Sequence, residues 1–389
     1  RLQLLPKSAG TDGVTRTGSL VRNEIKLEDQ AAKAYVLEDL PNALGLRIGV
    51  LEVPGFYRDF RAESDGDKDF RSTTRDVQGL LADLKRKGVD GIVVDLRGNG
   101  GGSLTEATDL TGLFIDKGPV VQVKDSFGKV EVESDVAAGA AYSGPLAVLV
   151  DRNSASASEI FSAAMQDYGR AIIIGEPTFG KGTVQTLIDL NRYVPGNGED
   201  LGRLRLTMAE FYRISGGSTQ LRGVEPDILF PTAPQGAEHG ERSLENALPW
   251  NSIHPAKYDK TKLGDLGTFR EASTQRIGGD PGFRMLTARE RVLRELDEEK
   301  TVSLKESDRR VQADRREKIL KHQRDEFLRA QGETPIDEEA EDVDEEVMER
   351  QQKVVEQIQI REAASILADV VRADTFRVRE AKSALWFSE

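Results

Sequence analysis

The sequence contains no cysteine, only three histidines and no long apolar run. The absence of cysteine excludes disulfides, thiolate metal sites and cysteine nucleophiles, although it leaves the redox compartment open. A membrane helix needs about 18 or more consecutive apolar residues, so we expect no direct transmembrane span. The chain begins at Arg1 rather than Met and shows no signal peptide, so we interpret it as a processed protein or a piece of a longer one.

Positive charge is also in short supply, because 54 Lys and Arg residues face 67 Asp and Glu residues, for a net charge of −13. This balance argues against a general nucleic-acid binder, which needs a basic surface to displace the counterions of the phosphates. Charge is concentrated in residues 251–389, where 57 of 139 residues are charged, against 64 of the first 250. The charged part therefore reads as a separate domain.

One acidic run stands out within this charged part. Residues 333–349 contain ten carboxylates and no basic residue. We interpret the run as a solvated loop with helix starts, and an interaction tail or a metal-binding stretch remains an alternative.

The first half of the chain alternates apolar runs with helical patterns. Helical spacing of apolar residues covers 76–87, and an Ala-rich helix is predicted over 155–167. This alternation predicts an α/β sheet with helices on both faces. Buried strands are predicted over 46–53, 91–95, 145–150 and 171–174.

The segments that flank this core have different patterns. Residues 1–6 and 19–27 alternate like strands, and 183–190 and 202–207 alternate like an antiparallel pair. From about Leu263 the chain reads as charged helices with short apolar stripes. The stripes contain Val292, Leu293 and Leu296; then Ile319, Leu320, Phe327 and Leu328; then Val355, Ile358, Ile366, Leu367, Val370 and Val371.

Three loops at the ends of predicted strands carry residues that suit chemistry, as expected at the strand ends of α/β proteins. The first, Asp95–Ser103, holds three consecutive glycines, Gly100, Gly101 and Gly102, between a strand and a helix. Backbone N–H groups in such a loop are free to face an anion. A plain tight turn explains the same pattern.

The second loop, 151–156, opens the Ala-rich helix and contains Ser156. A serine at a helix N-terminus experiences the positive end of the helix dipole, and the N–H groups that follow can form an oxyanion hole. The alternative is structural, because Ser156 and Glu159 also match S-x-x-E, the capping box.

The third loop contains Gly175-Glu-Pro-Thr-Phe-Gly-Lys-Gly-Thr, which partly matches the phosphate-binding pattern G-x-x-x-x-G-K-[ST]. Gly182 occupies the place of the metal-binding hydroxyl, and the residues after Lys181 alternate as a strand where a phosphate-binding loop would open a helix. Nucleotide binding is therefore disfavoured, and a turn with a surface lysine is the plainer interpretation.

A serine nucleophile needs a base, and His239, His254 and His322 all lie well downstream of the α/β part without a supporting motif. Lysine can serve as the base when burial disfavours its ammonium form and lowers its pKa. Lys181, between two glycines at an apolar strand end, suits this role.

The combined motifs closely resemble the tail-specific, or C-terminal processing, protease family. The resemblance rests on Ser154–Ile160 followed by Gly180–Gln185, with Leu96–Gly102 before them and Gly223–Asp227 behind. The segments 165–169 and 247–250 and the charged C-terminal part resemble the large periplasmic Prc-type branch. The resemblance covers nearly the whole chain.

This resemblance implies a set of site residues. The nucleophile is Ser156, the base is Lys181, and Gln185 orients the lysine. The oxyanion hole pairs the N–H of Ala157 with that of Gly101 or Gly102. The supporting residues are Glu159, Asp167 and Thr178. The resemblance implies no metal and no organic cofactor.

The resemblance also implies an architecture: an α/β fold with a crotonase- or ClpP-like protease core, an N-terminal β-strand strap and a C-terminal charged helical domain. Residues 1–6 are then the last strand of an otherwise missing PDZ domain, 7–45 the strap, 46–250 the core and 251–389 the helical domain. The implied substrates are periplasmic proteins with nonpolar C-termini, and the helical domain is expected to bind a lipoprotein adaptor.

Three rivals remain at this stage. A non-catalytic binding or scaffold protein of the same fold would have lost Ser156 or Lys181, and both are present, although the chain can still be inactive without its PDZ domain. A phosphate-loop nucleotide binder is the second rival. An acyl-CoA enzyme of the crotonase type would leave the spacing of serine and lysine unexplained.

Overall fold

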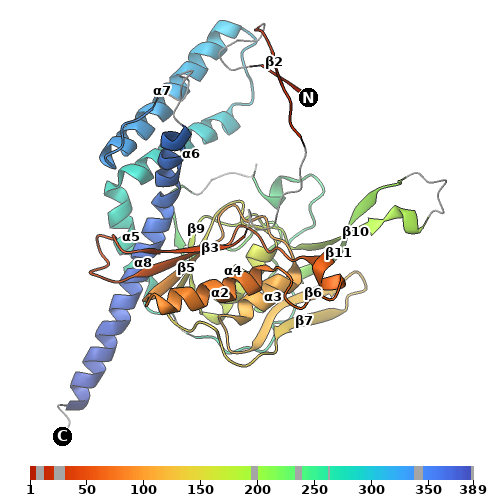
Figure 1. Cartoon of the computed structure of the whole chain (residues 1–389), viewed down its shortest axis with the longest axis vertical. Coiled ribbons are helices and arrows are strands. Elements are labelled where there is room, and N and C mark those ends of the chain that lie inside the picture. The colour runs from red at the N-terminus through yellow and green to blue at the C-terminus, as the bar shows by residue number, and fades with distance from the viewer. Residues whose placement is uncertain are drawn as a thin grey trace.

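The computed structural model describes residues 1–5, 13–21, 31–193, 200–232, 239–261, 263–336 and 345–386. A six-stranded sheet lies at the centre, with helices on both faces and an elongated helical region on one side (Figure 1). Within the described residues, no helix combines the length and the apolar character that crossing a membrane demands.

The central sheet has the strand order β12-β9-β8-β5-β4-β3, and every neighbouring pair is parallel except β3 and β4. The four apolar runs predicted as buried strands form β4, β5, β8 and β9, so this prediction is confirmed. The edge strand β12 was not predicted, and β3 was expected only as part of the β-strand strap over 7–45. The strands are β3 (Lys33–Leu37), β4 (Ile48–Glu52), β5 (Gly91–Asp95), β8 (Leu146–Val150), β9 (Ile172–Gly175) and β12 (Ile228–Leu229).

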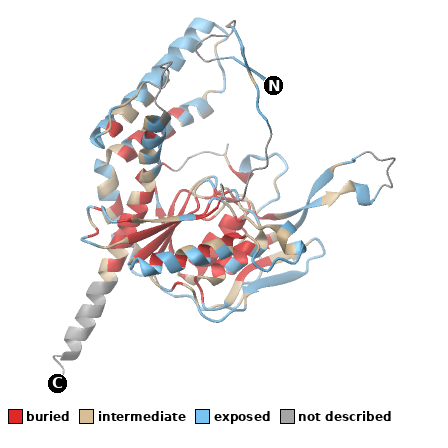
Figure 2. Ribbon diagram, viewed as in Figure 1, coloured by how far each residue is buried: buried red, intermediate tan, exposed pale blue. Residues whose placement is uncertain are grey.

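The sheet is covered on both faces, as its continuous apolar strands predict. Ile92 and Val94 of β5 belong to one hydrophobic cluster, whereas Val93 between them belongs to the other. The first cluster includes apolar residues of three helices, α2 (Thr73–Arg86), α3 (Leu104–Gly112) and α4 (Ala157–Tyr168). The second includes residues of the C-terminal helices, and buried residues gather between these layers (Figure 2).

A second, antiparallel sheet has the order β10-β11-β6-β7. The predicted antiparallel pair is confirmed as β10 and β11, which project from the body of the protein (Figure 1). The strands β6 and β7 were not predicted, although Val130 and Val132 of β7 alternate with glutamates. The four strands are β6 (Gly118–Asp125), β7 (Val130–Asp135), β10 (Thr183–Asp189) and β11 (Arg203–Tyr212).

The C-terminal part is helical, as predicted. Its helices are α5 (Leu266–Gly279), α6 (Pro281–Glu298), α7 (Glu306–Ala330) and α8 (Glu345–Trp386). Ile366 and Leu367 of α8 are fully buried in the cluster under the central sheet. The two shorter apolar stripes are mixed, because Val292, Phe327 and Leu328 are buried, whereas two members are exposed: Leu293 at 39% and Ile319 at 41%. Residues 337–344 of the acidic run lie outside the described residues.

The remaining elements are short. The predicted first strand is β1 (Leu2–Leu4), which pairs with β2 (Arg16–Gly18), a strand in a stretch that looked like a loop in the sequence. Most of the strand predicted over 19–27 lies outside the described residues. A short helix α1 (Phe60–Ser64) and two 3-10 turns, η3 (Leu190–Arg192) and η4 (Glu241–Ser243), complete the described elements.

Candidate active site

The three loops singled out in the sequence meet at the carboxyl ends of β5, β8 and β9. The backbone N–H of Ala155 donates to the carbonyl oxygen of Asn99 at 2.9 Å, and that of Phe179 donates to the carbonyl oxygen of Ser154 at 3.0 Å. The Ser154 hydroxyl donates to the carbonyl oxygen of Leu96 at 2.8 Å. These bonds join the glycine loop, the serine loop and the lysine loop into one unit.

Ser156 immediately precedes α4 in a strained backbone conformation. Its φ is +57° and its ψ is −110°, although it is not glycine. Such a conformation costs about 1–3 kcal/mol and persists only where the surroundings hold it. The N-terminus of α4 follows at once, so the positive end of the helix dipole lies next to the Ser156 side chain.

Glu159 holds this serine and the lysine loop together. Its buried carboxylate accepts hydrogen bonds from the backbone N–H of Ser156 at 2.7 Å, of Gly180 at 2.7 Å and of Lys181 at 3.0 Å, and from the Thr178 hydroxyl at 2.6 Å. Burial raises the pKa of Glu159 to about 7 against the opposing effect of these four donors. The hydrogen bond from the Ser156 N–H to the Glu159 carboxylate, which the capping box predicts, is therefore present. The same carboxylate also binds the lysine loop.

The backbone of residues 179–182 makes a hydrogen bond at every N–H and every carbonyl. The two glutamate contacts account for the N–H groups of Gly180 and Lys181, and the other groups bind four further segments. These bonds are Phe179 N to Ser154 O, Glu241 N to Phe179 O, Leu221 N to Gly180 O, Thr219 Oγ1 to Lys181 O, Gly182 N to Gln220 Oε1 and Phe211 N to Gly182 O. The lysine loop is therefore rigidly held independently of the lysine side chain.

The Lys181 side chain is half-buried, and this burial lowers the pKa of its amine. The charges of Glu241 and Glu159 raise that pKa, while the charge of Arg205 lowers it. Among the described residues, no hydrogen bond joins the Lys181 amine to the Ser156 hydroxyl. The structure thus brings the two backbones together and leaves the two side chains unbonded to each other.

The backbone N–H groups of Gly101 and Gly102, the two candidate oxyanion donors of the glycine loop, differ in their contacts. The N–H of Gly101 donates to Asn99 Oδ1 at 2.9 Å, and the buried Asn99 amide donates to the Val53 carbonyl oxygen at 2.8 Å. Within the described chain, the N–H groups of Gly102 and Ala157 have no hydrogen-bond acceptor. The free donors are therefore Ala157 and Gly102 rather than Gly101.

Gly102 has no room for a side chain. Its φ is +149°, and an added Cβ would lie 2.2 Å from the carbonyl oxygen of Phe56. Gly102→Ala is expected to lower the free energy of unfolding by about 2–4 kcal/mol, because it adds strain and a backbone clash. Urea denaturation measures the loss. Gly100→Ala is the matched control, since its Cβ would meet nothing within 4 Å; an equal loss in both variants would contradict this reasoning.

The other predicted site residues lie at different distances from this unit. Thr178 contacts Glu159 directly, as described. Gln185 is exposed on β10, and no hydrogen bond joins it to Lys181 among the described residues. Asp167 lies near the other end of α4 and forms a buried ion pair with Arg213 at 2.5 Å. Its contacts place Asp167 in the scaffold that holds the segment after β11.

The alternatives to a lysine base receive no support from the contacts. His239 places its Nε2 3.0 Å from the carbonyl oxygen of Arg152, and among the described residues no histidine contacts Ser156 by a hydrogen bond. The residues after Lys181 form β10, so the loop lacks the helix that a phosphate-binding loop opens.

Three residues beside the site were missed by the sequence reasoning. Asn99 holds the glycine loop, while Gln220 and Glu241 contact the lysine loop. Gln220 and Glu241 lie in segments without a helical or strand period, so no sequence pattern indicated them. Only the triple glycine next to Asn99 could have drawn attention to it.

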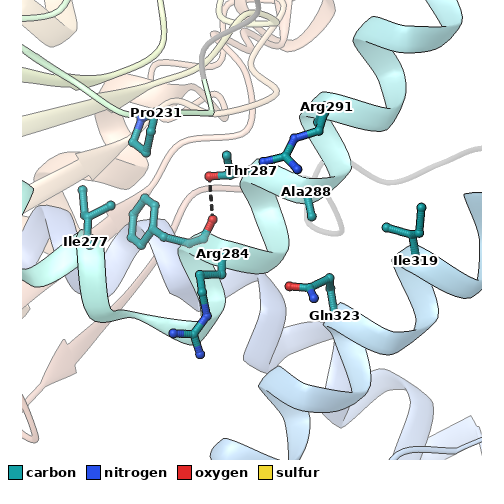
Figure 3. Close-up of a pocket in the computed structure, with 10 residues that line it drawn as sticks. Pro231, Ile277, Arg284, Thr287, Ala288, Arg291, Ile319 and Gln323 are labelled. Carbon is teal, nitrogen blue, oxygen red and sulfur yellow. Dashed lines mark hydrogen bonds between the residues drawn. The ribbon is translucent and has the colours of Figure 1, made fainter.

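A cavity of about 450 Å³ lies elsewhere, between α5, α6 and α7. Arg284, Arg291, Ile319 and Gln323 line it, and the Thr287 hydroxyl there donates to the Phe283 carbonyl oxygen at 2.7 Å (Figure 3). None of the residues that line it comes from the serine or lysine loop, so the candidate reactive groups and this cavity are separate.

Known families match both parts of the chain. Residues 47–230 match "Peptidase family S41", and residues 235–372 match "C-terminal domain of tail specific protease". The first match contains the three loops described above, and the second contains all four C-terminal helices up to the middle of α8.

The chain is also similar to individual proteins. The chain is 41% identical to the tail-specific protease of Haemophilus influenzae over 81% of this chain and 43% of that protein. It is 31% identical to the carboxy-terminal processing protease CtpA of Bacillus subtilis over 48% of this chain and 39% of that protein. The solved photosystem II D1 C-terminal processing protease is 28% identical, with a TM-score of 0.44, over 59% of this chain and 55% of that one. The chain therefore spans less than half the length of these two curated relatives.

Proposed function

The chain belongs to peptidase family S41, and on that premise we propose that it is a serine endopeptidase with Ser156 as nucleophile and Lys181 as general base. The observation that carries the proposal is the buried Glu159 carboxylate, which binds the backbone N–H of both residues. One carboxylate therefore fixes the backbone of a strained serine at a helix N-terminus and the backbone of a lysine with a lowered pKa. Nucleophilic catalysis needs this pairing of nucleophile and base.

The proposed reaction begins with the neutral amine of Lys181. The amine takes the proton of the Ser156 hydroxyl as the serine oxygen bonds to the scissile carbonyl carbon. The carbonyl oxygen becomes an oxyanion, which the free N–H groups of Ala157 and Gly102 stabilise. Protonated Lys181 then gives its proton to the leaving amine as the peptide bond breaks, leaving an acyl-enzyme.

Deacylation repeats these steps with water. Lys181, neutral again, takes a proton from a water molecule as its oxygen attacks the ester carbon. Collapse of the intermediate returns the proton to Ser156 and releases the new carboxyl end. Protein groups carry every proton transfer in this scheme, and we propose that no metal or organic cofactor takes part.

The finer assignments are proposals that rest on the family. We assign the substrates to periplasmic proteins with nonpolar C-termini, and the names of the tail-specific and carboxy-terminal processing relatives support selection at the C-terminal end. The division into a PDZ remnant (1–6), a strap (7–45), a protease core (46–250) and a helical domain (251–389) also remains a proposal. The helical domain is the surface proposed for a lipoprotein adaptor, and Gln185 is the residue proposed to orient Lys181 in the reacting complex.

The test is cleavage of an unfolded reporter protein with a nonpolar C-terminus, compared with the same reporter ending in two aspartates. We expect cleavage by the unsubstituted chain, a preference for the nonpolar end, and a loss of about 10³-fold or more in Ser156→Ala. Ser143→Ala, at an exposed serine, is the matched control and should cleave normally. Full cleavage by Ser156→Ala would contradict the nucleophile. No cleavage by the unsubstituted chain would contradict the proposal that these 389 residues form a working peptidase.

A further inference from the structure

Gln220 is a fully buried side chain that links the lysine loop to a second carboxylate. Its Oε1 accepts a hydrogen bond from the N–H of Gly182, the residue after Lys181, at 2.7 Å. Its Nε2 donates to Glu241 Oε1 at 3.2 Å and to the Leu248 carbonyl oxygen at 3.1 Å. Both ends of the amide are used, so its orientation is determined by its partners.

Glu241 attaches to the same loop in two ways. Its N–H donates to the carbonyl oxygen of Phe179 at 3.0 Å, and its carboxylate reaches Gly182 through Gln220. The residue is only 8% exposed, and among the described residues no lysine or arginine forms an ion pair with it. A buried carboxylate without a paired cation is uncommon, because burial of an unpaired charge is costly. The Glu241 carboxylate is therefore not engaged in an ion pair within the described residues.

Lys181 is the neighbour that this charge acts on. Three charged groups act on its amine: Glu241 from the η4 segment and Glu159 from α4 raise its pKa, and Arg205 from β11 lowers it. Glu159 already accepts four hydrogen bonds, which spread its charge over other donors. Glu241 has the stronger effect of the two carboxylates on the pKa of Lys181.

We propose that Gln220 and Glu241 are positioning residues for Lys181, with Gln220 holding the backbone beside the lysine and Glu241 stabilising the ammonium that forms when Lys181 takes a proton. The proposal rests on the assignment of Lys181 as the base. An acid that orients and stabilises a protonated base is the role of the aspartate in serine, histidine and aspartate triads. Here the carboxylate would serve a lysine, and a glutamine would fix the distance between them.

The test follows the protonation of Lys181 directly and needs no turnover. Ser156→Ala and Ser156→Ala/Glu241→Gln proteins are acetylated with a small amine-reactive reagent from pH 6 to 10, and modification of Lys181 is measured by peptide mass spectrometry. Glu241→Gln keeps an oxygen that accepts from Gln220 and removes only the charge. We expect the midpoint of the labelling curve to move to lower pH, with roughly three- to tenfold faster labelling at pH 8.

Two further variants separate electrostatics from structure. Glu245→Gln makes the same charge change at an exposed position four residues on and should leave the curve unchanged. Gln220→Ala should raise the plateau of labelling at high pH, because the loop loses a bond at Gly182 and the amine becomes more accessible. Gln220→Asn, which keeps an amide with both an acceptor and a donor, should restore part of the protection.

An unchanged midpoint in the Glu241→Gln protein would overturn the electrostatic role, whatever happened to its thermal stability. An unchanged plateau in both Gln220 variants would overturn the positioning role. Absence of peptide cleavage by the unsubstituted chain would instead contradict the proposed function. The labelling results would still decide whether Glu241 and Gln220 act on Lys181, because labelling needs no turnover.

Discussion

Lys181→Ala is expected to lose at least about four orders of magnitude in kcat/KM on an unfolded protein substrate while keeping its fold. The activity falls because the substitution removes the only proposed base for Ser156. The fold survives because the lysine loop is held by backbone atoms, which alanine retains. Single-turnover cleavage measures the first effect, and thermal unfolding followed by circular dichroism measures the second.

Lys181→Arg sharpens this prediction. A guanidinium keeps the positive charge and a long side chain, but it stays protonated in proteins and cannot act as a base. The arginine variant should therefore be as inactive as the alanine variant, whereas Lys117→Ala, at an exposed lysine, should cleave normally. Substantial cleavage by purified Lys181→Ala would refute the assignment of the base.

The pH dependence of cleavage follows from the same residue. Burial lowers the pKa of Lys181, so its neutral form is reached at a lower pH than for an exposed lysine. Cleavage should rise with pH as the amine loses its proton, with a midpoint below the usual range for lysine. A profile that stays flat across neutral and mildly alkaline pH would argue against a lysine base.

Glu159→Ala is expected to produce the second large effect, on stability and on activity together. The variant leaves the N–H groups of Ser156, Gly180 and Lys181 without their acceptor in a buried place. Each buried donor without a partner costs about 1–3 kcal/mol. We expect a loss of about 3–5 kcal/mol in the free energy of unfolding, measured by urea denaturation. We also expect kcat/KM to fall by about 10²-fold or more, because both reactive residues shift.

Two further variants control this prediction. Glu245→Ala removes an exposed carboxylate and should change neither quantity. Glu159→Gln should cost less stability than Glu159→Ala, because burial has already raised the pKa of Glu159 to about 7, so a neutral group is nearly tolerated there. Equal losses in Glu159→Ala and Glu245→Ala would contradict the bridging role.

The raised pKa of Glu159 also sets the sign of a pH effect on stability. From about pH 4.5, the ordinary value, to about pH 7, the folded protein holds a proton on Glu159 that the unfolded chain has released. The contribution of this proton to stability is full below that window and is lost as the pH rises through it. The free energy of unfolding should fall with rising pH relative to Glu159→Gln, which lacks the titrating group.

The sequence predicted the central strands correctly because a strand buried on both faces has a continuous apolar run. The loops after these runs were also identified as candidate sites, and they meet because the carboxyl ends of neighbouring parallel strands share one edge of the sheet. The short apolar stripes were correct only in part. Val292, Phe327 and Leu328 are buried, but Leu293 and Ile319 of the same stripes are 39% and 41% exposed. The strands β6 and β7 were also missed, although the valines and glutamates of β7 alternate.

Contacts between distant segments had no signal in the sequence. The charged C-terminal part was predicted as helical, yet nothing in its composition showed that Ile366 and Leu367 cover one face of the central sheet. Likewise, the lysine-loop partners Thr219, Gln220, Leu221 and Glu241 come from irregular segments after β11. A backbone N–H accepts any suitable oxygen that the fold brings near it, so such partners leave no periodic trace.

The order of strands and loops, the triple glycine, the serine before a helix and the lysine between glycines are local properties, and the sequence by itself determined them. The tertiary structure alone decided which glycine N–H stays free, that Ser156 adopts a φ of +57°, and that Glu159 binds both the serine and the lysine segments. The reason is physical: periodicity records which side of an element is buried, whereas hydrogen bonds and backbone strain depend on groups that only the complete fold brings into contact.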